Sequence, residues 1–386
     1  MSLELTCKID RILGTIGYHL LKRSVPERSK VRPETVKVIA VVKFLGGGSL
    51  TLAAPALLAL KKRYPDAEFL LLTTPAVRAN AELLGIYDRI FLFSPRKPFS
   101  AFKTLFQLKH LLSATASILL DLELYSRFTH ILTAWLSPAY SVGLALDGEK
   151  TLWDETLTVT PDLPMYEAYD RAAKSAGAEE FPEYPQKQWT VPAEERTKQL
   201  LIAPFCSALS LRREWDFDNW ASLLDDFLAL HEDFTAIILG APSDRERGEA
   251  LRQMLSETHQ QKVKSWCGTA DFKTAFDAIR HAAIFVGIDS APLHLARLSG
   301  TPAVSLWGAT DPVSLARPFK DYPEILLFAR QNCTPCVHKE NFSCPFSGSC
   351  TAQISCCDVL NAAEELLEGK VASTKFITPD IVEEKK

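Results

Sequence analysis

Short apolar runs that alternate with segments of helical periodicity constrain the fold of this chain more than any other feature. The run from Val36 to Val42 is rich in β-branched residues, as expected of a strand buried on both faces. A helical pattern from Leu50 to Leu58 follows it. Further strands are expected at 69–73, 89–93, 118–122, 200–204, 236–239, 284–287 and 303–306. Strands that alternate with helices form parallel sheets with right-handed crossovers, so the sequence predicts an α/β fold.

The alternation stops once, at residues 182–198, where three prolines stand among charged residues. Such a stretch is typical of a linker between domains, and 386 residues suit two domains of ordinary size. We therefore predict two Rossmann-like domains. The expected parts are a helix and tether (1–35), a first domain (36–184), a second domain (199–330), a Cys-rich loop with a C-terminal helix (331–370) and a flexible tail (371–386).

Composition excludes several classes of protein. A hydrophobic content of 47% with 23% charged residues is that of a globular chain, and a net charge of -4 gives no basic field for nucleic acid. No uncharged apolar run of eighteen residues occurs, so no transmembrane helix is expected. The N-terminus lacks the pattern of a cleavable signal, and the expected compartment is the cytoplasm.

The first residues form a separate amphipathic element. Apolar side chains such as Ile9, Ile12, Ile16 and Leu20 recur at spacings of three and four, and residues 1–36 hold seven Lys or Arg against four Asp or Glu. A basic amphipathic helix on a tether can lie in an anionic membrane surface. It can equally pack on its own protein, and the sequence leaves both readings open.

Glycines 46, 47 and 48 join the first strand to its helix. Glycines there let backbone amides approach a ligand, although many such turns need glycine only for its positive φ. No Lys-Ser/Thr pair follows them, which excludes a Walker-type phosphate loop, and Thr51 stands where a dinucleotide fingerprint requires its third glycine.

A second turn, in the second domain, carries a stronger signal. Asp289, Ser290, Ala291 and His294 follow an apolar strand and open a helix. A carboxylate, a hydroxyl, backbone amides and an imidazole at one helix N-terminus can hold a diphosphate and offset its charge as it leaves. The alternative is a capped helix with an ordinary buried histidine.

Taken together, these segments resemble glycosyltransferase family 9, which includes the lipopolysaccharide heptosyltransferases. The resemblance rests on the glycine loop with Pro55-Ala56-Leu57 and Tyr64-Pro65-Asp66-Ala67, on the segment 121–128, on the segment 289–312, and on Cys333-x-Pro-Cys336 with later cysteines. It implies a GT-B fold, with two Rossmann-like domains facing a central cleft. It also implies an inverting, metal-independent transfer of a sugar from a nucleotide-diphosphate donor of the ADP-heptose type.

The resemblance places the donor in the second domain and the acceptor in the first. The expected acceptor is a lipopolysaccharide-type, lipid-linked or other surface glycan, and the N-terminal helix would suit the inner membrane surface. The donor-binding residues that it implies are Asp289, Ser290, Ala291, His294, Arg213, Ser207, Ser210 and Asp244. The residues expected on the acceptor side are Gly46, Gly47, Gly48 and Arg127. Arg213 read alone is a surface charge, and Asp244 read alone is a helix cap.

Ser49 departs from the family pattern, since heptosyltransferases carry at this position an aspartate that serves as general base. A serine hydroxyl does not accept a proton at neutral pH without an adjacent base. Asp121 and Glu123, after the strand at 118–122, are the alternative candidates, unless they form a structural pair. If neither acts, the chain is a non-catalytic nucleotide-sugar or glycan-binding protein. Epimerisation of a sugar nucleotide on the same fold is a further reading.

Six of the nine cysteines lie between Cys333 and Cys357. Cys333, Cys336, Cys344 and Cys350 could form a tetrahedral zinc or iron site, although their spacing is not that of a two-knuckle zinc motif. Such a site would be structural, or would staple an assembly of several copies, because the transfer itself needs no cofactor. The alternative is a set of reduced thiols.

Overall fold

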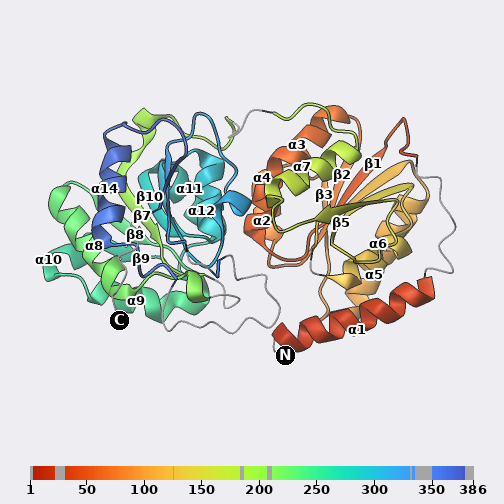
Figure 1. Ribbon diagram of the computed structural model, residues 1–386, viewed down its shortest axis with the longest axis horizontal. Helices are drawn as coiled ribbons and strands as arrows, with labels where there is room; N and C mark the ends of the chain where they lie inside the picture. The colour runs from red at the N-terminus through yellow and green to blue at the C-terminus, as the bar shows by residue number, and fades with distance from the viewer. Residues whose placement is uncertain are drawn as a thin grey trace. The chain divides into compact units, whose positions relative to one another are not determined.

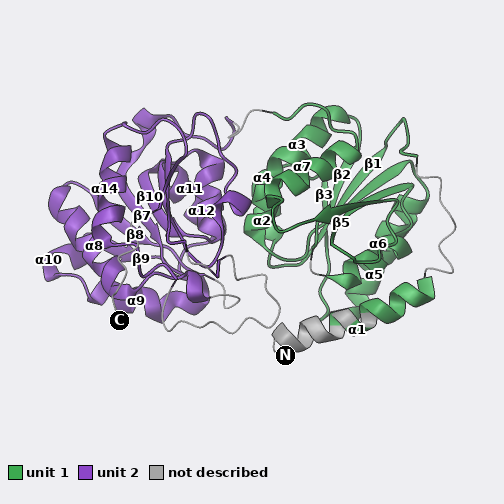
Figure 2. Cartoon of the chain, viewed as in Figure 1, with its two compact units in different colours: residues 1–183 green, residues 184–386 purple. Residues whose placement is uncertain are grey.

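The computed structural model describes residues 3–21, 31–124, 126–182, 187–206, 211–330, 333–334 and 350–378. It divides into two compact units, residues 1–183 and residues 184–386, and each unit has its own sheet (Figures 1 and 2). All strand pairs within both sheets are parallel. The predicted α/β class, with two Rossmann-like parallel sheets, is therefore confirmed.

The sheet of unit 1 has the strand order β3-β2-β1-β4-β5-β6. Its strands are β1 (Val38–Val42), β2 (Glu68–Thr73), β3 (Arg89–Leu92), β4 (Ser117–Asp121), β5 (Tyr140–Leu146) and β6 (Glu155–Val159). Every residue of β1 and β4 is buried, because helices cover both faces at the centre of the sheet. At the edge of the sheet, β6 alternates exposed and half-buried positions.

Helices form a layer on each face of this sheet (Figure 1). On one face, α5 (Pro98–Ser113) and α6 (Arg127–Leu136) bury leucines against β1, β2 and β4. On the other, α3 (Ala54–Arg63) packs against α7 (Met165–Ser175). The short helices α2 (Gly47–Leu52) and α4 (Arg78–Leu84) contact each other.

The N-terminal helix α1 (Leu3–Leu21) packs on α6. Asp10 caps α6: its carboxylate accepts hydrogen bonds from the backbone N–H groups of Arg127 (2.7 Å) and Phe128 (3.0 Å). A Cβ at Gly14 or Gly17 would lie within 2.6 Å of α6 side chains, so glycine is needed for this close approach. One face of the predicted amphipathic helix is thus used within the protein.

The opposite face of α1 is bare. Ile12, Ile16 and Leu20 follow one another at intervals of four residues and are 61%, 52% and 67% exposed. No helix among the described residues has the length and apolar character needed to cross a membrane.

The sheet of unit 2 has the strand order β13-β12-β11-β10-β7-β8-β9. Its strands are β7 (Thr197–Ala203), β8 (Thr235–Ile238), β9 (Val263–Ser265), β10 (Ala282–Ile288), β11 (Ala303–Trp307), β12 (Glu324–Phe328) and β13 (Lys375–Ile377). The strand β13 lies within the segment expected to be a flexible tail. Its register with β12 orders at least those three residues.

The helices of unit 2 enclose a large apolar core. On one face, α8 (Phe217–Leu230) packs against α14 (Cys356–Leu367), with Trp220 and Phe227 buried between helix and sheet. Elsewhere α11 (Phe272–His281) packs against α12 (Ala291–Ser299). The remaining helices are α9 (Arg245–Gln253), α10 (Glu257–Gln260) and α13 (Pro312–Leu315), with 3-10 turns η1 (Ala193–Glu195), η2 (Leu211–Arg213) and η3 (Pro242–Asp244).

Candidate functional site

In unit 1, the loop between β1 and α2 is held by one carboxylate. Glu123 Oε1 accepts hydrogen bonds from the backbone N–H groups of Phe44 (2.5 Å) and Leu45 (2.8 Å). Glu123 Oε2 lies 3.2 Å from Lys43 Nζ, and both side chains are more than 90% buried. Glu123 therefore fastens the start of the glycine loop to the end of β4.

Lys43 lies at the centre of this buried cluster. Burial alone lowers the pKa of Lys43, but the nearby Tyr169 and Glu123 raise it above its ordinary value, so the ammonium stays charged. Burial raises the pKa of Tyr169 as well, and a hydrogen bond with Ser49 acts in the opposite direction. Ser49, Tyr169, Lys43 and Glu123 thus form a connected polar group behind the glycine loop.

Asp121 lies deeper than Glu123, with no exposed surface. Its Oδ1 accepts a hydrogen bond from the N–H of Glu123 (3.1 Å), and its Oδ2 lies 3.4 Å from the Thr133 hydroxyl. Burial raises the pKa of Asp121 to about 8. Its carboxyl group is therefore largely protonated at neutral pH, and a protonated acid is a poor general base.

The glycines of the loop have different local duties. Gly46 precedes α2 with a φ of 79°, which favours glycine. A Cβ at Gly47 would lie 2.3 Å from Asn80 of α4, so glycine allows the two short helices to approach. Gly48 is buried inside α2, and Ser49 beside it is half-buried.

In unit 2, three neighbouring strands bring polar groups to the carboxyl edge of the sheet. Arg213 follows β7, Asp289 and Ser290 follow β10, and Thr310 follows β11. This edge of a parallel sheet is where α/β proteins bind ligands. Arg213 Nη1 donates to the backbone oxygen of Asp289 at 2.9 Å and lies 3.3 Å from its Oδ2.

Asp289 also faces His294, whose Nε2 lies 3.7 Å from Asp289 Oδ1. Burial alone raises the pKa of Asp289, but His294 and Arg213 outweigh it and hold that pKa below its ordinary value. Asp289 is therefore a carboxylate that orients two basic side chains at the start of α12.

Two buried hydroxyls near this turn, Ser290 Oγ and Thr310 Oγ1, make no hydrogen bond of normal geometry among the residues that the structure describes, although Thr310 lies close enough to Asp289 to help lower the pKa of that carboxyl. Ser290 occupies the N-cap position of α12 but makes no capping hydrogen bond with its side chain. Buried polar groups are almost always satisfied, so an orphaned pair requires an explanation such as a ligand. The backbone amide of Ala291 opens the same helix, where the helix dipole favours an anion.

Asp244 closes a turn after β8. Its Oδ2 accepts a hydrogen bond from the backbone N–H of Ala241 (2.9 Å), and its Oδ1 lies 3.6 Å from Arg247. Arg247 also forms an ion pair with Glu214, and its guanidinium lies 4.6 Å from the centre of the Phe205 ring. Sequence reasoning missed Arg247 and Glu214, although Glu214 directly follows Arg213.

Ser207, Ser210, Cys336 and Cys344 lie outside the described residues. Of the other two predicted metal ligands, Cys333 is half-buried, and Cys350 is buried where a Cβ at Gly308 would touch it. Within the described ranges, no group of three or more His, Cys, Asp or Glu could hold a metal ion.

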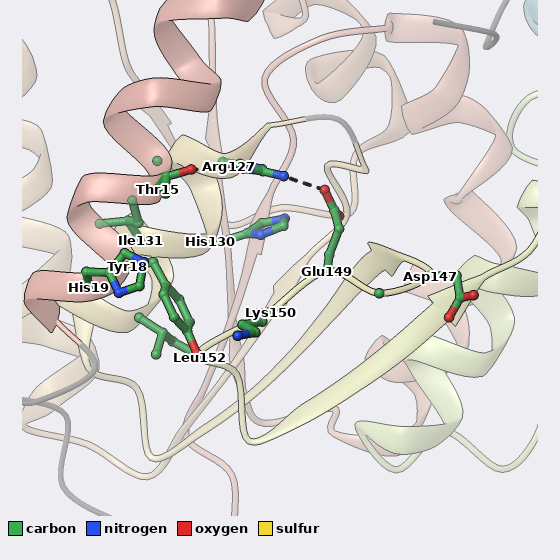
Figure 3. A pocket seen from close by; sticks show the side chains of 12 residues that line it. Thr15, Tyr18, His19, Arg127, His130, Ile131, Asp147, Glu149, Lys150 and Leu152 are labelled. Atoms are coloured by element: carbon green, nitrogen blue, oxygen red, sulfur yellow. Dashed lines mark hydrogen bonds and ion pairs between the residues drawn. The ribbon is translucent and has the colours of Figure 1, made fainter.

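Unit 1 also holds a cavity of about 400 Å³ beside α1 (Figure 3). Its walls are Gly14, Thr15, Tyr18 and His19 of α1, Arg127, His130 and Ile131 of α6, and Asp147, Gly148, Glu149, Lys150 and Leu152 after β5. Arg127, predicted on the acceptor side, lies 3.8 Å from Glu149 and donates to the Thr15 hydroxyl at 2.9 Å.

His130 is the buried polar group of this cavity. Its side chain packs on Trp153, with ring centres 4.2 Å apart, and its Nε2 has no partner in the described part of the chain. Burial lowers the pKa of His130 to about 4, so the imidazole is neutral at physiological pH and can either donate or accept a hydrogen bond.

Comparison with known proteins agrees with this architecture. Residues 158–345 match the model of glycosyltransferase family 9 (heptosyltransferase). A curated relative, lipopolysaccharide heptosyltransferase 3 of Escherichia coli, is 23% identical over 295 residues, which are 68% of this chain and 81% of the relative.

Two solved structures have the same fold. The glycosyl transferase family 9 structure from Veillonella parvula has a TM-score of 0.68 at 16% identity, covering 87% of this chain and 99% of that one. The E. coli heptosyltransferase WaaC with ADP has a TM-score of 0.63 at 15% identity, covering 85% and 99%. They confirm the expected GT-B fold class, and with the family match and the curated relative they lead to one conclusion. The chain is similar to glycosyltransferase family 9 over residues 158–345, and its fold is that of the two solved structures.

Proposed function

We propose that the protein transfers a heptose from an ADP-heptose-type donor onto a lipopolysaccharide-type glycan, with inversion at the anomeric carbon. The observation that carries this proposal is the orphaned pair of hydroxyls, Ser290 Oγ and Thr310 Oγ1, beside Arg213 at the start of α12. A diphosphate supplies the acceptor oxygens that both hydroxyls lack. The ADP named with the WaaC structure supports an adenine nucleotide.

Each residue of the turn has a distinct role in this proposal. Ser290, Thr310 and the amide of Ala291 donate hydrogen bonds to the diphosphate. Arg213 and His294, oriented by Asp289, offset the negative charge that grows on the leaving group as the glycosidic bond breaks. Donors that are already in place at a buried site stabilise this charge without reorganising, and this favours the transition state.

For the acceptor we propose the cavity between α1 and α6. The ring of Tyr18 offers an apolar face, while Asp147, Lys150 and the neutral His130 offer hydrogen-bonding groups, a mixture that suits a hydroxyl-rich sugar. Arg127 carries a positive charge for an acidic sugar or a phosphate on the glycan. The exposed row on α1 would then face the lipid part of such an acceptor, at the cytoplasmic surface of the inner membrane.

At the glycine loop we propose positioning roles for the buried carboxylates in place of a base. Glu123 accepts two loop amides and faces Lys43, and Asp121 keeps its proton at neutral pH. Ser49 is the more exposed group there, and we propose that its hydroxyl orients the attacking hydroxyl of the acceptor, whose proton is released to solvent water as the new glycosidic bond forms and the nucleoside diphosphate departs. The transfer itself requires no metal, and a zinc or iron site at the cysteines would be structural.

Calorimetric titration with nucleotide diphosphates tests the donor site. We expect the protein to bind ADP more tightly than UDP or GDP, and Arg213→Met to weaken ADP binding at least tenfold, because a charge-assisted contact is lost. Arg171→Met, at an exposed arginine of α7, is the matched control. Equal binding of ADP by both variants would contradict the assignment. Release of ADP from ADP-heptose that depends on a glycan acceptor would then separate transfer from binding alone.

A further inference from the structure

The helix α5 presents an aromatic face that is exposed among the described residues of unit 1. Phe99, Phe102 and Phe106 are 92%, 65% and 54% exposed. On the opposite face, Leu108 and Leu112 are completely buried in the core. The exposed phenylalanines follow the i, i+3, i+7 spacing of one helical stripe, so α5 has two apolar faces and uses only one of them in folding.

The aromatic stripe continues onto α6. The rings of Phe102 and Phe106 stack with centres 6.3 Å apart, and the Phe106 ring meets the edge of Trp135 at 5.2 Å. Trp135 is half-buried at the end of α6, and Lys109 Nζ lies 4.4 Å from the centre of its ring. Tryptophan and lysine side chains in this setting are typical of the boundary between lipid and water.

The charge around the stripe has one sign. Arg96, Lys97 and Lys103 are exposed on or beside α5, and no Asp or Glu occurs anywhere from Ser94 to Leu120. The whole chain has a net charge of -4, so this stretch differs sharply from the rest. A basic surface with exposed phenylalanines is complementary to anionic lipid headgroups above an apolar layer.

We propose that this surface, formed by Phe99, Phe102, Phe106 and Trp135 with Arg96, Lys97 and Lys103, docks unit 1 on an anionic lipid bilayer. The phenylalanines enter the interface, and the cations meet the headgroups. The bare row of α1 lies on a helix that contacts α6, as α5 does, and adds apolar surface to the same helical layer. This role is independent of the donor site in unit 2.

Sedimentation of the full chain with vesicles tests the proposal, with phosphatidylcholine vesicles compared to vesicles that contain one third phosphatidylglycerol. We expect binding to the anionic vesicles that weakens in high salt. The triple variant Phe99→Ser, Phe102→Ser, Phe106→Ser should bind at least tenfold more weakly. Removal of residues 1–30 is a poorer test, because Asp10 caps α6 and its loss would disturb the fold.

The matched control replaces three exposed apolar residues of unit 2 by serine: Leu230, Met254 and Phe376. Its vesicle binding should equal that of the wild type. Wild-type protein that ignores anionic vesicles, or a triple phenylalanine variant that still binds them, would overturn the proposal. The proposal would also be overturned if the wild type did not bind lipid and analytical ultracentrifugation showed that it dimerises while the phenylalanine variant does not. ADP affinity should be unchanged in every variant, so a negative result for membrane docking would not contradict the proposed donor site.

Discussion

The turn from β1 to α2 and the turn from β10 to α12 have the same strand-to-helix topology but differ in how their buried polar groups are hydrogen-bonded. After β1, the first two amides of the glycine loop are satisfied from within, because Glu123 accepts the N–H groups of Phe44 and Leu45 and faces Lys43. After β10, the turn into α12 leaves Ser290 Oγ without a partner, and the neighbouring Thr310 Oγ1 is also unsatisfied in the part of the chain that the structure describes. The first turn has an internal carboxylate that accepts two of its amides, and only Asn80 Nδ2 beside Gly47 lacks a partner there among the described residues; the second turn leaves two hydroxyls unsatisfied.

This contrast agrees with the sequence, in which the α12 turn carries a stronger signal than the glycine loop. Three consecutive glycines look like a ligand-binding loop, yet here the loop is fixed by a carboxylate of the next strand in the sheet. The α12 turn has no glycine run, yet its hydroxyls are unsatisfied among the described residues, which is why we propose it as the donor site. Groups that bind a ligand must be left unpaired in the free protein, at some cost in stability.

The largest effect is expected when Glu123, which holds the glycine loop through two amides and Lys43, is replaced. Glu123→Leu leaves Lys43 buried and unpaired and removes the acceptor from two amides, so we expect a loss of about 3–5 kcal/mol in the free energy of unfolding. Differential scanning calorimetry should show this loss in the transition of unit 1. ADP affinity should change less than twofold, because the donor turn belongs to unit 2.

Glu123→Gln serves as the graded control, since its amide oxygen still accepts the two N–H groups and only the charge is lost. It should be less destabilising than Glu123→Leu. If both variants instead kept full stability but lost transfer activity, Glu123 would be the base and not the group that holds the glycine loop.

The fold was largely predictable because its central strands are buried on both faces and therefore appear as apolar runs. Strands β5, β6, β9, β12 and β13 were not predicted. Thr156 and Thr158 on the edge strand β6 and Gly143 in β5 interrupt the pattern, since Gly143 must admit the ring of Trp153. The sequence spacing of the strands also does not reveal which strands are neighbours in each parallel sheet.

The sites were predictable only where the polar residues are close in sequence. Asp289, Ser290 and His294 lie on one turn, and their grouping was visible. The contact of Arg213 with Asp289 spans 76 positions, and the hydrogen bond from Phe44 to Glu123 spans 79. Both depend on which strands are neighbours, β7 with β10 and β1 with β4, and strand order is not written in local sequence.

A second test uses pH, because the pKa of Asp121 is raised and the pKa of Asp289 is lowered. Asp121 keeps its proton in the folded state up to a pKa of about 8, while the unfolded chain loses it near pH 4. The folded state therefore loses stability as pH rises from about 4 to 8. Asp121→Asn cannot ionise, so its stability relative to wild type should rise by about 2 kcal/mol between pH 6 and 8.

Asp289→Asn should behave differently in the same urea titrations. The pKa of Asp289 is lowered, so its stabilising contribution is fully present above its unfolded pKa and is lost only as pH falls below about 4. Between pH 6 and 8 its stability relative to wild type should therefore stay constant. If the stability of both variants relative to wild type changed with pH in the same way, the pKa values of the two aspartates would not be shifted in opposite directions.

The smallest expected effect tests the orphaned hydroxyls themselves. Ser290→Ala and Thr310→Val remove groups that have no hydrogen-bond partner among the described residues, so stability should be unchanged or higher by up to about 1 kcal/mol. Each should weaken ADP binding by roughly five- to tenfold, about 1 kcal/mol, because a hydrogen bond to the diphosphate is lost.

Ser117→Ala in unit 1 is the matched control, because Ser117 Oγ is buried and donates to the backbone oxygen of Leu112 at 2.7 Å. This variant should lose about 1 kcal/mol of stability and keep its ADP affinity. The comparison thus predicts a crossed result: the satisfied hydroxyl affects folding alone, and the unsatisfied ones affect binding alone. If Ser290→Ala and Thr310→Val destabilised the protein as Ser117→Ala does, while ADP affinity held, the α12 turn would be an internally satisfied scaffold like the glycine loop.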